Sequence, residues 1–343
     1  MQPTFISSWN DLVEETFAGS FSARLERFRS PYAFRGMVAD WPVVSSLQRL
    51  RHDPQTLGFI EKAMFRNFKK YAYADFDASN SDWKWLSLAQ HHGLPTRLLD
   101  WTFSPFVAMH FATNELDKMD KDGVLWMVNF ERVRSYLPGF FRNALSQHYA
   151  LTFSVEMLEE DDALIDPFVF ERTEGAQDPF VMFFEPPSLD PRIVNQWGLF
   201  SFTNRLDIRL DEWLLERSAN DPELVRKIII SSAAKWEIRD KLDNMNLTER
   251  VLMPGLDGLS TWLKRWYSPK SAHPVAASPG PAQAAPALPP EPKAGTLVGS
   301  GAQARGRKKK SGSTTKTARK PATAAARSTK PPTKKAKVAS RPR

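Results

Sequence analysis

Cysteine is absent from this 343-residue chain, which excludes several kinds of chemistry at once. Disulfide bonds, thiolate metal ligands and cysteine nucleophiles are all ruled out. The sequence also has no apolar run of about 18 residues, so no membrane-spanning helix and no membrane partner are expected. The first residues, MQPTFISSWNDL, lack the basic start and apolar stretch of a secretory signal. A cytoplasmic location is therefore expected, with association with the nucleoid as one form of it.

Several motifs for phosphates, metals and nucleophiles are missing as well. The chain contains neither GxxxxGK[ST] nor GxGxxG, so a bound nucleotide would be held by side chains and other backbone groups. The adjacent His91 and His92 point about 100° apart if they lie on a helix, unlike zinc-binding histidines at i and i+4. The acidic run 159–162 is typical of a solvated loop. No metal is expected, and no GxSxG nucleophile elbow occurs.

Phe, Tyr and Trp are absent from residues 268–343, whereas 12 of the 26 prolines fall there. So little apolar surface cannot offset the entropy cost of ordering the backbone, about 1–2 kcal/mol per residue, so we expect this segment to be disordered. Residues 268–303 form a linker rich in Pro and Ala, and residues 304–343 form a basic tail. The folded domain is expected to span residues 1–267, and residues 206–266 could be a helical subdomain within it.

The net charge of +8 divides into two parts of opposite sign. Residues 268–343 carry 17 Lys and Arg against one acid, Glu291, which gives +16 and leaves 30 basic and 38 acidic side chains, or −8, in residues 1–267. Basic side chains without aromatics can neutralise phosphates but cannot stack on bases. The tail resembles those of linker histones and bacterial histone-like proteins, which implies sequence-independent binding of nucleic acid. The candidate nucleic-acid-binding residues are Arg307, Lys308, Lys309, Lys310, Lys320, Lys334, Lys335 and Lys337. A membrane tether, a solubility function and docking onto the acidic domain are the alternatives.

The domain mixes signals of helix and strand without a strict strand–helix repeat. Ser8, Ser81 and Ser104 are predicted to cap helices, and Gly93 to stop the second of them. Residues 57–68 have a helical apolar stripe, and residues 247–266 are predicted to be helical with a break at Pro254-Gly255. Strands are predicted at 32–36, ended by Gly36, and at 96–101, 124–130, 180–184, 199–203 and 227–231. The predicted fold class is α+β: a single large mixed domain with an interrupted, mostly antiparallel sheet and flanking helices, plus the disordered tail.

Three stretches of this domain resemble a known bacterial family. YAFRG at residues 32–36 is followed by WPVVSSLQR at 41–49 and by WLSLAQHHGLPTRLLDWTFSPFVAMHFA at 85–112. These motifs, with RIVNQWGLFSF at 192–202, resemble the FRG-domain family, named for a Phe-Arg-Gly tripeptide. The resemblance covers about residues 7–203. That family brings no settled biochemical function with it.

The motif layout is similar, more loosely, to ADP-ribosyltransferase-type folds. In those folds an Arg or His on a first strand, a Ser/Thr-containing second strand followed by a helix, and a late Glu surround bound NAD. Arg35 takes the position of the Arg or His on the first strand. Asp100, Thr102 and Ser104 lie where the hydroxyl residues of the second strand are expected, although Asp100 is not a hydroxyl residue. The late position falls on Gln196, which is not a Glu. The resemblance implies NAD as the candidate cofactor.

Arg35, His92 and Gln196 are the candidate catalytic residues. Arg35 can bind a phosphate or carboxylate with its guanidinium fork, and the alternative is a structural ion pair with Asp100. His92 can donate a hydrogen bond or act as a general acid, and the alternative is a cation favoured by a helix C-terminus. Gln196 can hydrogen-bond a ribose hydroxyl but cannot be a general base.

Arg97, Asp100, Thr102 and Arg192 are the candidate ligand-binding residues. Arg97 and Asp100, three apart on a predicted strand, should point to opposite faces, so that one lines a cleft while the other pairs elsewhere. Arg192 and Gln196 share a face if their segment is helical. Ser104 is interpreted as a helix cap rather than a nucleophile.

Two functions of different class remain open. In the first, the domain binds a small nucleotide-like ligand, with NAD-dependent ADP-ribosyl transfer as its enzymatic form, and the tail holds it on nucleic acid. In the second, the domain is a non-enzymatic module that binds a ligand or a protein and is tethered to DNA by the tail. Whether the protein is an enzyme, its acceptor and its oligomeric state are left undecided.

Overall fold

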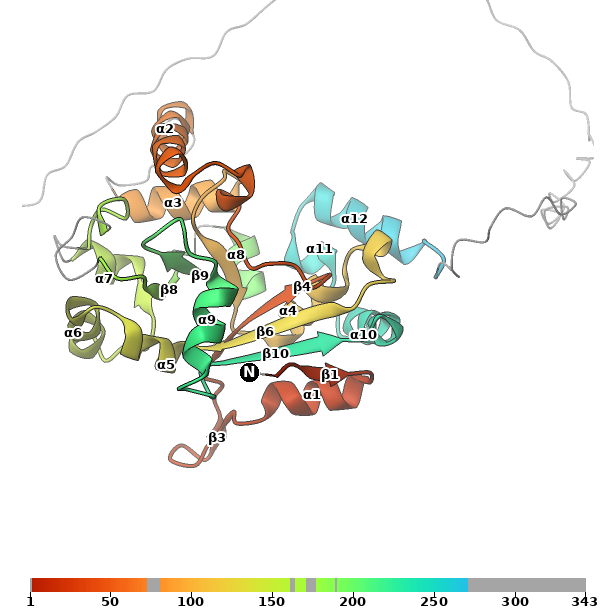
Figure 1. Cartoon of the computed structure of the whole chain (residues 1–343). Helices are drawn as coiled ribbons and strands as arrows, with labels where there is room; N and C mark the ends of the chain where they lie inside the picture. Colours follow the sequence, from red (N-terminus) through yellow and green to blue (C-terminus); the bar gives the residue numbers. More distant parts are fainter. Residues whose placement is uncertain (1, 73–80, 161–163, 171–176, 189, 271–343) are drawn as a thin grey trace, which may run out of the picture. The chain divides into compact units, whose positions relative to one another are not determined.

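The computed structural model describes residues 2–72, 81–160, 164–170, 177–188 and 190–270. The linker from residue 271 and the whole basic tail lie outside the described residues, as do the nucleic-acid-binding residues expected there. Helices and strands together form a mixed α+β domain around one large, mainly antiparallel sheet, as predicted (Figure 1). No helix in the described ranges is long and apolar enough to cross a membrane.

Eight strands form the main sheet, in the order β1-β10-β6-β4-β5-β9-β8-β7. Only the outer pairs β1·β10 and β7·β8 are parallel. A separate hairpin is made by β2 (Phe21–Ser22) and β3 (Arg27–Phe28). The strands of the main sheet are β1 (Thr4–Ile6), β4 (Tyr32–Met37), β5 (Leu99–Thr102), β6 (Gly123–Asn129), β7 (Phe153–Ser154), β8 (Val181–Glu185), β9 (Gly198–Thr203) and β10 (Val225–Ile230).

Helices surround this sheet and connect its strands. The α-helices are α1 (Trp9–Phe17), α2 (Pro54–Ala72), α3 (Asp82–His91), α4 (Pro105–Thr113), α5 (Phe130–Val133), α6 (Gly139–Gln147), α7 (Val155–Glu159), α8 (Pro191–Gln196), α9 (Leu210–Ser218), α10 (Ser232–Asn244), α11 (Glu249–Leu252) and α12 (Leu256–Trp266). Short 3₁₀ turns occur at Gln48–Leu50, Leu116–Lys118 and Arg134–Tyr136. Residues 206–266 are mostly helical, but they also supply β10, which lies between β1 and β6 in the main sheet.

The sheet has a narrow joint between β4 and β5. Six residue pairs join β4 to β6, but a single pair, Phe34–Thr102, joins β4 to β5. Two half-sheets therefore meet at one point, and the strands on either side of it are not held together by further ladder bonds. This joint interrupts the sheet beside Arg35 and Asp100, at a place that the sequence did not predict.

Gly36 does not end its strand, contrary to the sequence prediction, because β4 continues to Met37. Instead, it lets α4 approach the strand. A Cβ atom built at Gly36 would lie 1.7 Å from the carbonyl oxygen of Ala108 on α4, which no real side chain could tolerate. The glycine is thus explained by close packing of helix on strand rather than by a turn.

The predicted helix caps are confirmed. The hydroxyls of Ser8, Ser81 and Ser104 accept hydrogen bonds from backbone N–H groups of the first turn of α1, α3 and α4. Gly93, with φ of +81°, follows α3 in the left-handed conformation that terminates helices. The strand predicted from residue 96 begins only at Leu99. The backbone N–H groups of residues 96 and 97 are bound by the side chains of Ser46 and Glu61 instead of a neighbouring strand.

Three buried clusters hold the two half-sheets. One packs α1, α4 and α10 against β4, β6 and β10, around Phe34 and Met127. A second lies on the opposite face with α9, around Trp101 and Trp126. The third joins α2, α3, α6 and α7 to β8 and β9 and is rich in aromatic rings, with Trp83 at its centre. Because the clusters lie on both sides of the joint, the space beside it is held open by well-packed walls.

Candidate functional site

A large cavity lies beside the joint of the two half-sheets. Its volume is about 740 Å³, which falls within the range of small-molecule sites. Its walls come from β4, the segment after β4, the end of β5, the end of α4 and α8. The lining residues are Phe34, Arg35, Gly36, Met37, Val38, Trp41, Pro42, Val43, Val44, Gln48, Arg49, Arg51, Asp100, Trp101, Thr102, Phe111, Asn114, Glu115, Arg192, Gln196 and Arg209.

A smaller cavity of about 290 Å³ adjoins the large one. It extends towards the C-terminal end of α3 and includes Gln90 and His91. Its wall is partly common with that of the large cavity, and the residues that line both are Arg49, Asp100, Trp101, Arg192 and Gln196. The two cavities therefore lie side by side with a common wall, and we call them the large and the small compartment of one cleft.

The charge of the large cavity contrasts with that of the domain that contains it. Five arginines line it, against Asp100 and Glu115 as the only carboxylates among its described lining residues. The domain, residues 1–267, has a net charge of −8. Side chains of one sign that converge in a hollow raise the local concentration of ligands of the opposite sign. The cavity is therefore suited to an anion.

Arg35 has an incompletely satisfied guanidinium group. Its Nη1 donates to the backbone carbonyl of Asp100, but its Nε is buried without a hydrogen-bond partner in the described part of the chain. Burial lowers the pKa of Arg35, and the Asp100 charge only partly opposes this effect. A buried cation without a full set of acceptors is costly, so an incoming anion would be bound strongly here.

Arg192 and Arg49 extend the positive wall. The side chain of Arg192 has no hydrogen-bond or ion-pair partner among the described residues, although its backbone N–H donates to Asp190 at 2.6 Å. Arg49 makes one bond, from Nη1 to the carbonyl of Val44 at 3.0 Å. Arg209 differs, because Asp211 and Glu212 neutralise its charge. We define the anion cluster as Arg35, Arg49 and Arg192.

Asp100 presents its carboxylate to both compartments and is fixed by a chain of polar groups. The hydroxyl of Thr96 donates to Gln90 Oε1 at 2.6 Å, and Gln90 Nε2 donates to Asp100 Oδ2 at 2.9 Å. Gln90 therefore cannot turn its amide around without losing both bonds. The carboxylate of Asp100 is oriented by α3 and remains exposed on its other side.

Gln196 and Thr102 lie on the cavity wall, but their polar atoms are largely used by the fold. The hydroxyl of Thr102 donates to the backbone carbonyl of Gln196 at 2.6 Å and accepts from the N–H of Ser104 at 3.0 Å. The side-chain Nε2 of Gln196 donates to the carbonyl of Leu252 at 2.8 Å. The amide oxygen and the second amide N–H of Gln196 remain available to a ligand.

Arg97 lies away from both cavities. Its side chain is buried, and it forms an ion pair with the buried Glu61, at 2.8 Å from Nε and 2.7 Å from Nη2. The rings of Phe168 and Phe202 flank the guanidinium at 5.8 and 5.5 Å. The predicted division between Arg97 and Asp100 therefore has Asp100 in the cleft and Arg97 paired within the core.

His92 is exposed and lines neither cavity, so it does not lie with Arg35 and Gln196. Its neighbour His91 takes the place in the small compartment, with Nε2 at 3.4 Å from the carboxylate of Asp190. Burial lowers the pKa of His91 below its usual value although Asp190 acts in the opposite direction, so the ring is neutral at pH 7. A neutral imidazole next to a carboxylate can accept a proton.

Aromatic and aliphatic groups form the rest of the large cavity. Trp41 is 45% exposed and lines the cavity, as do Phe111 and Met37. An exposed indole ring beside an arginine cluster can stack on a planar group of a ligand. The cavity thus combines a place for an anion with a place for a flat apolar group.

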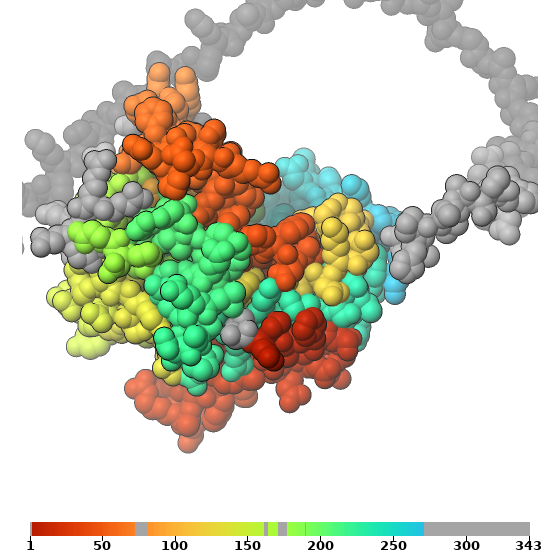
Figure 2. Space-filling view, viewed as in Figure 1, coloured from red at the N-terminus to blue at the C-terminus, as the bar shows by residue number. Residues whose placement is uncertain are grey.

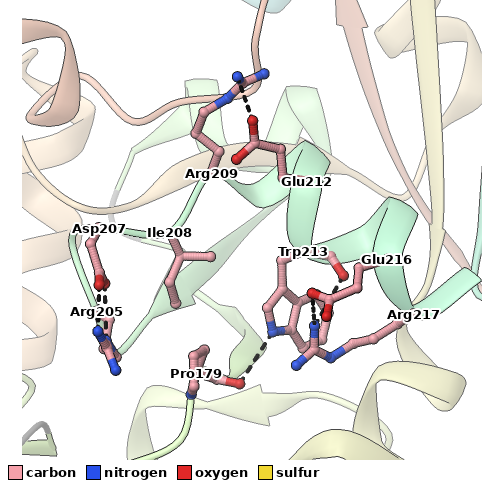
Figure 3. A pocket seen from close by; sticks show the side chains of 9 residues that line it. All are labelled: Pro179, Arg205, Asp207, Ile208, Arg209, Glu212, Trp213, Glu216 and Arg217. Atoms are coloured by element: carbon pink, nitrogen blue, oxygen red, sulfur yellow. Dashed lines mark hydrogen bonds and ion pairs between the residues drawn. The ribbon is translucent and has the colours of Figure 1, made fainter.

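A third recess, of about 270 Å³, lies over α9 and shares only Arg209 with the large cavity. Its ions are paired with one another: Arg205 with Asp207, Arg209 with Glu212 and Arg217 with Glu216 (Figure 3). Trp213 donates its indole N–H to the carbonyl of Pro179 and carries the guanidinium of Arg217 at 4.2 Å from its ring centre (Figure 3). We therefore do not assign a ligand to this recess.

Metal-binding groups do not converge in the part of the chain that the structure describes. No three His, Asp or Glu side chains there are placed to hold an ion. That the protein uses no metal remains a prediction from the sequence.

The comparison with protein families supports the resemblance carried by the motifs. The family model of the FRG domain matches residues 30–121, a span that contains β4, α3, β5 and α4. No curated protein and no solved structure matches the chain significantly. The chain therefore carries an FRG domain, as the motifs predicted. That domain contributes Arg35, Arg49, His91 and Asp100 to the cleft, whereas Arg192 and Gln196 come from the chain beyond it.

Proposed function

We propose that the domain binds a small nucleotide-like anion in the cleft beside the sheet joint. The observation that carries the proposal is the anion cluster, which opens into a cavity of about 740 Å³ within an acidic domain. Arginine is well suited to phosphate because its fork offers paired N–H donors. Here three such forks face one space, and one of them has a buried, unpartnered donor.

The cleft offers a place for each part of a nucleotide. Phosphates would bind to Arg35, Arg49 and Arg192, and a base would stack against Trp41. The carboxylate of Asp100 would accept hydrogen bonds from ribose hydroxyls. Such bonds to a charged acceptor are stronger than bonds to a neutral one. A dinucleotide such as NAD would extend from the large compartment into the small one, beside His91.

NAD-dependent ADP-ribosyl transfer is the enzymatic form of this proposal. The support is the motif layout, which resembles that of ADP-ribosyltransferase-type folds, with Arg35 on β4, Asp100 on β5 and α4 after it. Two observations favour different residues for the chemistry than the sequence did. Asp100 is the carboxylate that lines both compartments, and His91 is an imidazole that lines the small one. In this form Asp100 would stabilise positive charge on the ribose, and His91 would accept the proton of the acceptor.

A ligand-binding module without catalysis is the second candidate. It is favoured by the hydrogen bonds of Thr102 and Gln196, whose hydroxyl and amide N–H groups serve the fold and leave little for a reaction. Binding affinity alone does not separate the two candidates. Release of nicotinamide from NAD, with nucleic acid or protein present as acceptor, does so directly.

For the basic tail, we propose sequence-independent binding of nucleic acid, which would hold the domain on DNA or RNA. The support is compositional: a net charge of +16 in residues 268–343 and clusters such as Lys308–Lys310. The alternatives for the tail are a membrane tether, a solubility function and docking onto the acidic domain. None of them requires nucleic acid.

The ligand proposal is tested by titrating the full chain with NAD, ADP-ribose and adenosine in a calorimeter. We expect NAD and ADP-ribose to bind at least about tenfold more tightly than adenosine, because only they bring phosphates to the arginines, and a tenfold ratio corresponds to about 1.4 kcal/mol. Equal affinity for all three would show that the arginines do not read phosphate. Absence of heat with every ligand would remove the proposal.

A further inference from the structure

The β2–β3 hairpin projects from the domain as a separate small unit. It is held by the pairs Phe21–Phe28 and Ser22–Arg27 and forms no ladder with the main sheet. In both views it extends beyond the lower edge of the domain (Figures 1 and 2). Residues 23–29 are all exposed. The hairpin therefore adds little to the stability of the fold.

Large apolar side chains lie at the surface of this hairpin, where water contacts them. Phe21 is 54% exposed, Leu25 49% and Phe28 60%. The two rings contact each other edge to face, with centroids 5.3 Å apart, so they form one continuous aromatic surface. Exposed aromatic pairs on a projecting element are unfavourable unless a partner covers them.

The charged side chains of the hairpin are mostly positive. Arg24, Arg27 and Arg29 accompany a single acid, Glu26, although the domain as a whole is acidic. None of the three arginines forms an ion pair with another described residue. Arg29 donates to the backbone carbonyl of Phe28, within the hairpin itself. The hairpin is thus a positively charged aromatic projection on a negatively charged domain.

We propose that this hairpin binds single-stranded nucleic acid, with bases stacked on Phe21 and Phe28 and phosphates bound by Arg24, Arg27 and Arg29. Aromatic rings interleaved with arginines are the two elements that such binding needs, since stacking tolerates any base and the cations follow the backbone. Unpaired bases are required, because a paired base does not offer its face to a ring. The hairpin is positively charged and a nucleic-acid strand is negatively charged, which favours this partner over a protein.

This inference extends the nucleic-acid binding proposed for the tail, but it does not depend on it. The tail has no aromatic residue and can bind only phosphates, whereas the hairpin can also stack. The two sites therefore differ in what they prefer. The tail alone would bind single strands and duplexes through charge, and the hairpin would add a preference for single strands that persists when salt screens the charges.

The experiment is ultraviolet crosslinking of the full chain to a 20-nucleotide oligomer of 5-iodouridine, followed by mass spectrometry of the linked peptides. We expect links at Phe21 or Phe28 in addition to links in the tail. Links confined to the tail would overturn the hairpin proposal while leaving the function of the tail intact. Absence of all links would also overturn the hairpin proposal, whereas the tail, which has no aromatic ring, is tested by the salt dependence of duplex binding.

A variant pair measures the contribution of stacking. In 0.5 M salt, F21S/F28S is expected to weaken binding of a (dT)20 probe about tenfold and to leave binding of a duplex unchanged. F59S is the matched control, because Phe59 on α2 is 75% exposed but has no arginine cluster beside it. Equal affinity of F21S/F28S and F59S for the probe would contradict the proposal.

An anionic membrane is the other surface that aromatic and basic side chains can bind. Vesicles of phosphatidylserine and phosphatidylcholine are therefore tested with the same variants. We expect no difference between F21S/F28S and the unmodified chain in this assay. Loss of vesicle binding in F21S/F28S, with (dT)20 binding retained, would assign the hairpin to lipid and refute its assignment to nucleic acid.

Discussion

At the scale of single residues, two arginines with buried guanidinium nitrogens serve opposite purposes. Arg97 and Glu61 satisfy each other inside the core, and the backbone N–H of residue 97 completes the set. Arg35, in contrast, keeps a buried Nε without a partner at the wall of an open cavity. A residue that the fold leaves incompletely bound is available to a ligand, at some cost to stability.

Replacement by methionine separates these roles. Arg97→Met leaves the Glu61 carboxylate buried without a partner, and we expect it to lower the free energy of unfolding by about 3–5 kcal/mol. Arg35→Met removes a cation whose charged form burial disfavours, so a change within about 1 kcal/mol is expected. Denaturant unfolding of both variants measures the difference. A loss for Arg35→Met as large as that for Arg97→Met would mean that Arg35 is structural.

His110 gives the fold a dependence on pH. Its ring is buried beneath α10, and Arg239 Nη1 donates to its Nδ1 at 2.8 Å. Burial, with the neighbouring Arg239 charge, lowers the pKa of His110 from 6.5 to about 3, so the ring is neutral in the folded protein. The unfolded chain takes up this proton first as the pH falls below 6.5, and stability is therefore lost from there down to about pH 3.

We expect the free energy of unfolding to decrease by up to about 1.4 kcal/mol per pH unit below pH 6.5 because of this residue. In His110→Asn the asparagine can still accept from Arg239 but does not titrate, so the decrease between pH 6.5 and 4.5 should be smaller. Denaturant unfolding at several pH values tests this. Parallel curves for the two proteins would show that His110 does not cause the dependence.

At the scale of elements, the sequence predicted helix ends and strand patterns better than partners across the chain. Ser8, Ser81 and Ser104 are local signals, because a cap and the N–H that it binds are three residues apart. Glu61 lies 36 residues before Arg97, and no local pattern could connect them. The choice between His91 and His92 depended on the rotation of α3 about its axis, which the packing of that helix decides.

The close contact between α4 and β4 can be tested by its effect on stability. In Gly36→Ala the new methyl group would collide with the Ala108 carbonyl, so strand and helix must separate. We expect a loss of about 3 kcal/mol or more in the free energy of unfolding. Gly139→Ala is the control, because a Cβ there meets nothing within 4 Å. Equal stability of the two variants would contradict the close contact of α4 with β4.

At the scale of the whole molecule, the chain combines an acidic domain and a basic segment. The predicted α+β class with an interrupted sheet is confirmed. It could be predicted because the spacing of apolar residues indicates which segments are helices and which are strands, and the class does not depend on the order of the strands in the sheet. The strand order and the single-pair joint could not be predicted, since pairing between distant strands depends on the whole core. The cleft itself follows from that joint, so the sequence could anticipate some of its residues, such as Arg35, Asp100 and Gln196, but not its shape.

For the tail, we expect binding to random duplex DNA to weaken steeply with salt. For each tenfold increase in salt concentration, the logarithm of the association constant K should fall by about 0.9 per phosphate neutralised. Replacing Lys308, Lys309 and Lys310 with glutamine in the full chain should reduce this slope by up to about 3. Fluorescence anisotropy of a labelled duplex between 0.05 and 0.3 M salt (about the range in which such slopes are measured) provides the comparison. An unchanged slope would show that these lysines do not bind phosphates.

The arginine wall of the cleft is tested most directly by calorimetric titration of ADP-ribose into the full chain carrying Arg192→Gln, beside Arg66→Gln as the control. Arg192 has no partner for its side chain among the described residues, so its loss should not disturb the fold. Arg66 is an exposed arginine of α2 that lines neither compartment. We predict that Arg192→Gln weakens binding about tenfold and that Arg66→Gln binds as the unmodified chain does. Equal affinities of the two variants would contradict a phosphate site in this cleft.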